Sequence, residues 1–224
     1  MEKIELIMLD HPPHSPTYKK MGLSLRCMLI KVVLFFAIFI IVFHLPHFTP
    51  IIRYLPTGTR FFIEGLANKE ETIQEIRKVL EKYPTGLANV TKEELAEVIY
   101  EEATRYNHDP KFIMALIAIE SSFQNWSVSE RGAKGLMQIM PCVAESLARE
   151  MGIEWSGDRT LFNPFLNIRM GIYYLSRLTL DFNDMGIALT AYNCGPTYVK
   201  SLIEKRERIP LQYYRKILTV YQNL

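Results

Sequence analysis

An unbroken apolar run that ends on one acidic residue is the part of this sequence best suited to chemistry. Residues 112–119 (FIMALIAI) lead directly into Glu120, and two serines follow. In a helix, the residues three, four and seven positions earlier share its face, and all are apolar: Ile117, Leu116 and Ile113. Burial raises the pKa of a carboxyl group, and an acid that is still protonated near neutral pH can protonate a glycosidic oxygen. A Glu that reaches solvent at a helix end is the alternative interpretation.

Three further segments place polar side chains among apolar ones. Gln138 interrupts GLMQIMP (135–141), Tyr192 and Asn193 precede a Gly-Pro break, and Tyr213 and Tyr214 fall in the last predicted helix. Tyrosine and asparagine together offer a stacking surface and amide hydrogen bonds, which suit a sugar that carries an N-acetyl group. Each segment also has a structural interpretation, because Asn before Gly often caps a helix and buried tyrosines often belong to a core.

The elements that must position these residues are predicted to be helices. Capping signals at Thr91 with Glu94, at Asp109 and at Asn163 begin three of them, and Pro141 begins another. The predicted helices cover 70–83, a stretch after Thr91 that includes 95–103, 110–120, 141–152, a long stretch from Pro164 that includes 165–182, about 184–192, about 196–205 and a stretch after Pro210. No segment alternates with period two, so little β-structure is expected. One all-helical domain of about 150 residues fits this pattern.

The front of the chain predicts a membrane anchor. Residues 27–45 are interrupted only by Lys31 and His44, and as a helix they would be about 28 Å long, close to the thickness of the hydrocarbon core. Five basic residues precede the uninterrupted apolar stretch 32–43, and two follow it. This excess predicts that the N-terminus lies on the cytoplasmic side of the membrane. A cleavable signal peptide is the alternative, because the apolar stretch 32–43 is short. However, no cleavage site of the A-x-A kind follows it.

The predicted organisation is a cytoplasmic tail (1–26), a transmembrane anchor (27–45), a juxtamembrane connector with a leading helix (46–90) and a main domain (91–224). Beyond residue 44, 21 basic and 21 acidic residues balance, so no nucleic acid partner is expected. Three cysteines are too few for a disulfide scaffold. Cys142 and Cys194 are predicted to be small buried thiols, with a disulfide between them as the alternative.

Taken together, the motifs resemble the catalytic domain of soluble-type lytic transglycosylases, which has a goose-lysozyme-like fold. The resemblance covers about residues 92–222, with Asn163 where Asp is more usual. The matching segments are E-S-S-F (120–123), S-x-x-G-A-x-G-L-M-Q-I-M-P (129–141), N-P…N-I…G…Y-L (163–175) and A-Y-N-x-G-P (191–196). The resemblance implies an all-α, lysozyme-like helical domain. In this chain the domain is expected to be preceded by the single N-terminal transmembrane helix predicted above.

The resemblance also implies an activity and its residues. Glu120 would be the single acid and base that cleaves the MurNAc–GlcNAc β-1,4 bond of peptidoglycan without water, giving 1,6-anhydroMurNAc. The motifs contain no second carboxylate, which a retaining glycosidase of the usual design needs. The substrate-binding positions implied are Ser121, Met137, Gln138, Tyr192, Asn193 and Tyr213. Ser121 would orient Glu120 or contact the glycan, and Gln138 would donate a hydrogen bond to it. Tyr213 is chosen over Tyr214, although the segment IPLQYYRKIL lacks the family's usual Glu-Thr pair.

No metal or organic cofactor is expected. The predicted location is the bacterial inner membrane, with the helical domain in the periplasm. Its partners would be peptidoglycan strands, the inner membrane and an envelope or secretion machine. Two alternatives stay open: a lysozyme-like muramidase, and a catalytically silent peptidoglycan-binding scaffold.

Overall fold

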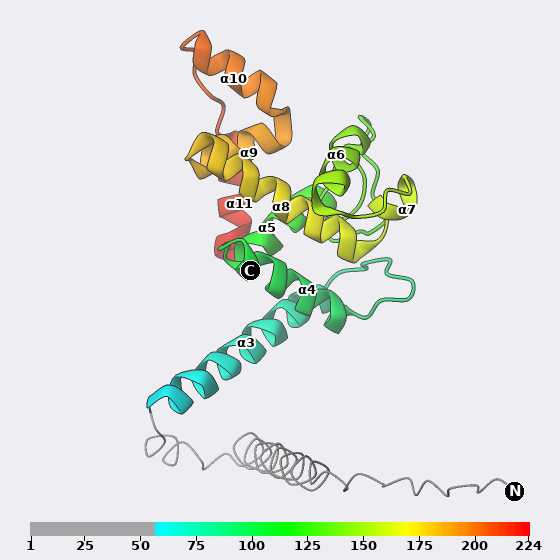
Figure 1. The fold of residues 1–224 in the computed structure, drawn as a ribbon, viewed down its shortest axis with the longest axis vertical. Coiled ribbons are helices and arrows are strands. Elements are labelled where there is room, and N and C mark those ends of the chain that lie inside the picture. Colours follow the sequence, from blue (N-terminus) through cyan, green and yellow to red (C-terminus); the bar gives the residue numbers. More distant parts are fainter. Residues whose placement is uncertain (1–56) are drawn as a thin grey trace, which may run out of the picture. The chain divides into compact units, whose positions relative to one another are not determined.

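The structure is a computed structural model that describes residues 57–224, with side chains from residue 65 onward. Its helices run in the order α3 (Thr57–Glu81), α4 (Lys92–Arg105), α5 (Pro110–Ser121), α6 (Pro141–Met151), α7 (Asp158–Leu161), α8 (Pro164–Phe182), α9 (Met185–Cys194), α10 (Pro196–Glu204) and α11 (Gln212–Asn223) (Figure 1). Within this range there is no β-strand, and the only β-pairing consists of two isolated bridges around Lys134. The prediction of a mainly helical domain is therefore confirmed.

The predicted tail (1–26), the predicted transmembrane anchor (27–45) and residues 46–56 of the connector lie outside the described residues. In the part that is described, no helix is both long and apolar enough to cross a membrane. Helix α3 begins at Thr57 and so starts well before residue 70, where the sequence predicted this helix to begin.

The helix starts that the sequence predicted are present with their hydrogen bonds. The Thr91 hydroxyl accepts the Glu94 N–H at 3.1 Å, while the Glu94 carboxylate accepts the Thr91 N–H at 2.8 Å. Asp109 caps α5 by accepting the N–H of Lys111, and Asn163 caps α8 by accepting two N–H groups. These bonds satisfy amide groups that would otherwise lack a partner in the first turn, so local sequence alone sets where three helices begin.

Helix α5 forms the centre of the compact unit that spans Ile63 to Leu224. Its residues 113–117 are buried without interruption, as expected for a helix that is covered on most sides. Helix α11 packs against α5, and α8 packs against α4 and α9. The second half of α3 contributes Ile73, Ile76 and Leu80 to the same core, so this helix packs with the domain that follows it.

Candidate active site

The C-terminal end of α5 places Glu120 at the edge of the core. Ile113, Leu116 and Ile117, which share its helix face, are fully buried, while Glu120 itself is half-buried. Burial raises the pKa of Glu120 to about 7, against a hydrogen bond from Tyr213 that lowers it. The helix ends one residue later, because Ser122 adopts a left-handed backbone with φ of 51°. The prediction that this carboxyl group projects from the core-facing side of a helix is confirmed.

Tyr213 brings the first turn of α11 to this carboxyl group. Its hydroxyl donates a hydrogen bond to Oε1 of Glu120, although the two residues are 93 positions apart in the sequence. Burial, and next the negative charge of Glu120, hold the pKa of the Tyr213 hydroxyl far above its usual value. Tyr213 therefore keeps its proton and remains a donor across the physiological pH range. The neighbouring Tyr214 packs instead against Gly186.

The loop at 135–140 is fixed to the helices around it by side chains. The Ser121 hydroxyl donates to the Leu136 carbonyl at 2.8 Å, and the Tyr192 hydroxyl donates to the Met137 carbonyl at 2.8 Å. Burial, followed by the charge of Glu120, raises the pKa of Tyr192 well above its usual value, so this bond too has a permanent donor. The loop is thereby tied to both α5 and α9.

A third tie comes from Asn167 on α8, which is fully buried. Its Oδ1 accepts the Met137 N–H at 2.7 Å, and its Nδ2 donates to the carbonyls of Lys134 and Leu161 at 3.0 and 2.9 Å. A side chain could not be added at Gly135, because its φ is +82° and a Cβ there would lie 2.3 Å from Asn167 Nδ2. The sequence analysis included Asn167 only as one residue of a motif. Its position, an amide side chain on the apolar face of a predicted helix, was the signal that could have identified it as a structural residue of the site.

Glu120 opens into a groove of about 610 Å³. The residues that line it come from α5, α9 and the segment 129–140: Glu120, Ser129, Glu130, Arg131, Ala133, Gln138, Met140, Tyr192, Asn193 and Cys194. Four residues predicted from the sequence therefore meet here: Glu120, Gln138, Tyr192 and Asn193. The sequence analysis did not anticipate Glu130 and Arg131, which supply the charges in the lining other than that of Glu120.

Three of the predicted roles need correction. The Met137 side chain does not line the groove but is fully buried against α8, where a Cβ on Gly171 would lie 2.4 Å from its sulfur. The Ser121 hydroxyl bonds to backbone carbonyls rather than to Glu120. The Gln138 amide nitrogen already donates to the carbonyls of Ser127 and Gly135, so the group that Gln138 has left for a ligand is its carbonyl oxygen, an acceptor.

The prediction of buried thiols was wrong. Cys142 and Cys194 are both free and exposed. Cys194 is the last residue of α9, where the helix end opens onto the groove, and Cys142 lies in the first turn of α6. Position at a helix terminus, rather than residue size, decides their exposure. Among the described residues, no three His, Cys, Asp or Glu side chains gather as a metal site would require.

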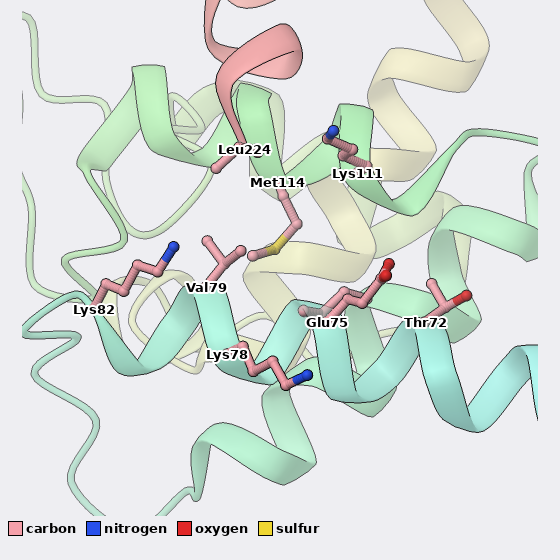
Figure 2. A pocket seen from close by; sticks show the side chains of 9 residues that line it. Thr72, Glu75, Lys78, Val79, Lys82, Lys111, Met114 and Leu224 are labelled. Atoms are coloured by element: carbon pink, nitrogen blue, oxygen red, sulfur yellow. The ribbon is translucent and has the colours of Figure 1, made fainter.

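A second cavity of about 340 Å³ lies between α3, α5 and Leu224 (Figure 2). Figure 2 shows Met114 of α5 reaching toward Val79 of α3, with lysines at the rim. Its acidic residue, Glu75, is exposed, and the cavity shares no residue with the groove. The half-buried carboxyl group with the raised pKa, Glu120, thus lines the groove and not this cavity.

The chain belongs to the transglycosylase SLT domain family. The sequence model of this family matches residues 97–212, a little over half of the 224 residues. The resemblance found in the motifs is thus confirmed. Glu120, Gln138 and Asn193 fall inside the matched span, whereas Tyr213 lies just beyond it.

Among known proteins, the chain is similar to the membrane-bound lytic murein transglycosylase C of Actinobacillus pleuropneumoniae, with 30% identity over 125 residues, or 51% of this chain and 34% of that protein. It is also similar to the membrane-bound lytic murein transglycosylase F of Desulfosudis oleivorans, with 36% identity over 110 residues, or 46% of this chain and 22% of that protein. An inactive mutant of lytic transglycosylase Slt from Pseudomonas aeruginosa aligns with a TM-score of 0.46 and 29% identity, covering 56% of this chain and 21% of that one. The chain spans about a third or less of the length of these relatives.

Proposed function

We propose that this protein is a peptidoglycan lytic transglycosylase that cleaves the MurNAc–GlcNAc β-1,4 bond without water and leaves 1,6-anhydroMurNAc ends. One observation carries the proposal: a half-buried carboxyl group whose pKa is raised to about 7 opens into a groove with amide and phenol groups. The relatives named as lytic murein transglycosylases support the reaction class.

In the proposed reaction, the protonated Glu120 carboxyl gives its proton to the oxygen that links the two sugars, and the bond from that oxygen to C1 of MurNAc breaks. The C6 hydroxyl of the same MurNAc then attacks C1 and closes the anhydro ring. The Glu120 carboxylate takes up the proton that this hydroxyl releases. The acid is restored at the end of the cycle, and no water is consumed.

The surroundings of Glu120 suit both halves of this cycle. With a pKa of about 7, the protonated and ionised forms are both available near neutral pH, as a group that acts first as acid and then as base requires. The Tyr213 hydroxyl, a permanent donor, stabilises the carboxylate that forms when the proton leaves. The tyrosines and amides of the groove offer stacking and hydrogen-bonding groups for N-acetylated sugars.

A muramidase that uses water is the second candidate, because Glu130 also lines the groove. In a retaining hydrolase the two carboxyl groups lie about 5 Å apart, where a like charge would raise the pKa of the acid. Burial and Tyr213 account for the pKa of Glu120, with no contribution from Glu130. This favours the single-carboxylate reaction. A silent peptidoglycan-binding scaffold would have no use for an acid with this pKa.

We further propose that the enzyme is held at the bacterial inner membrane by residues 27–45, with its helical domain in the periplasm and an envelope or secretion machine as a partner. The apolar segment and the basic residues before it support this location. The relatives that are named membrane-bound are matched by this chain over 34% and 22% of their length.

The test is mass spectrometry of the sugar fragments released from purified peptidoglycan. The wild-type protein should release muropeptides one water lighter than reducing ends, and Glu120→Gln should release none while still binding peptidoglycan. Glu130→Gln separates the two candidates, because a hydrolase that relies on Glu130 would lose activity with it. Reducing ends from the wild type would refute the transglycosylase, and full activity in Glu120→Gln would remove Glu120 from the mechanism.

A further inference from the structure

Glu130 and Arg131 are adjacent charged residues that line the groove and have no part in the acid–base chemistry proposed above. Neighbouring Lys134 forms an ion pair with Asp158 at 2.6 Å, whereas Glu130 and Arg131 have no ion-pair partner in the described part of the chain. Both are exposed, so each keeps its charge available to a ligand in the groove.

A tight turn fixes the backbone at these two residues. The Gly132 N–H bonds to the Ser129 carbonyl at 2.9 Å, which closes a four-residue turn with Glu130 and Arg131 at its two central positions. The Ser129 hydroxyl accepts the Ala133 N–H at 2.9 Å, and the Ser129 N–H bonds to the Ala133 carbonyl at 2.9 Å. The charged pair is thus carried on a fixed backbone, which limits the entropy lost when a ligand binds.

The charged pair lines the same groove as Glu120 but comes from a different segment of the chain. The groove is therefore lined by Glu120 from α5 and by a charged wall, Glu130 and Arg131, from the segment 129–140. Glycan strands carry charge chiefly on the peptide attached to muramic acid, whose free carboxylates and amine would find complementary partners in such a wall.

We propose that Arg131 and Glu130 bind the charged peptide stem of the strand, so that the protein prefers glycan that still carries its peptides. In this arrangement Arg131 takes a stem carboxylate, for which its planar fork of N–H donors is suited, and Glu130 takes an ammonium group. The inference rests on the proposed function, because it assumes that the groove holds a peptidoglycan strand.

The experiment compares two substrates with the full-length protein: peptidoglycan with its stems, and the same material after an amidase has removed them. The measured quantity is the ratio of kcat/KM on the two. Wild type should favour the substrate with stems. Arg131→Ala should lower the ratio roughly two- to fivefold, as expected for an exposed ion pair, and Glu130→Gln should lower it less. Arg131→Lys, which keeps charge but not the fork, should fall between Arg131→Ala and wild type.

Arg208→Ala is the matched control, because Arg208 is exposed and lies outside the groove, so its ratio should equal that of wild type. High salt should also reduce the wild-type preference, because screening weakens exposed ion pairs. An unchanged ratio in both Arg131→Ala and Glu130→Gln would overturn the inference. If wild type releases no anhydro ends from either substrate, the proposed function itself has failed, and this outcome is distinct from the loss of preference alone.

Discussion

Replacing Glu120 by Gln should change how the stability of the protein depends on pH. The pKa of this carboxyl group is about 7 in the folded chain, against an ordinary value of 4.5, and burial is the main cause. Between these two pH values the folded state holds a proton that the unfolded state has released. Raising the pH therefore favours unfolding in the wild type, whereas Gln carries no proton to lose.

The size of the effect follows from the pKa difference. Each pKa unit between the folded and unfolded states corresponds to about 1.4 kcal/mol, so a rise from 4.5 to about 7 amounts to about 3 kcal/mol. The stabilising contribution of protonated Glu120 is fully present below pH 4.5 and is lost as the pH rises through 7. Glu120→Gln should accordingly gain up to about 3 kcal/mol over wild type between pH 4 and pH 8.

Urea unfolding of both proteins across this pH range measures the difference, with Trp126 and Trp155 as fluorescent reporters, since the chain has 2 tryptophans. The pH 4 measurement is an internal control, because position 120 is neutral in both proteins there. Parallel curves of unfolding free energy against pH would refute the reasoning, because they would mean that Glu120 titrates alike in the folded and unfolded chains. This result is independent of any enzymatic assay.

Two further substitutions test the contacts of the site. Tyr213→Phe removes the hydrogen bond that lowers the pKa of Glu120, so the limb of the kcat/KM–pH profile that reports Glu120 should move to higher pH, with roughly a tenfold loss of kcat at neutral pH. Gly135→Ala forces a Cβ to within 2.3 Å of Asn167 Nδ2 and should destabilise the fold by about 3 kcal/mol or more, measured by urea unfolding.

Each of these has a matched control in the chain. Tyr214→Phe alters the adjacent phenol, which makes no bond to Glu120, and should leave the pH profile unchanged; an equal shift in both variants would mean that the Glu120–Tyr213 bond is not the cause. Gly132 has a positive φ similar to that of Gly135, but a Cβ added there would contact nothing. Gly132→Ala should therefore lower the free energy of unfolding by only about 1 kcal/mol. Equal costs at Gly132 and Gly135 would contradict the role given to crowding.

The sequence was sufficient for features that depend on local chemistry. The caps at Thr91, Asp109 and Asn163 form within a few residues, so the helix starts could be predicted. The face on which Glu120 lies follows from the spacing of apolar residues in one helix. The four-residue helix α7 was missed, because so short an element leaves no periodic pattern.

Features that depend on long-range contacts or backbone direction could not be predicted in this way. The bonds from Asn167 to the loop join residues up to 33 positions apart. Gln138 has a φ of +49°, which redirects the chain, so that Gln138 faces the groove while adjacent Met137 enters the core. The letters of a motif do not record this turn, and the two residues were assigned the same role.

The bond between Tyr213 and Glu120 has a consequence for the moment at which the protein becomes able to act. A ribosome releases residue 120 long before it makes residues 212–223, which form the helix that packs against α5 and carries the phenol. A growing polypeptide therefore carries Glu120 before its tyrosine partner exists, and the carboxyl group gains this bond only when residues 212–223 have been synthesised and have docked on α5.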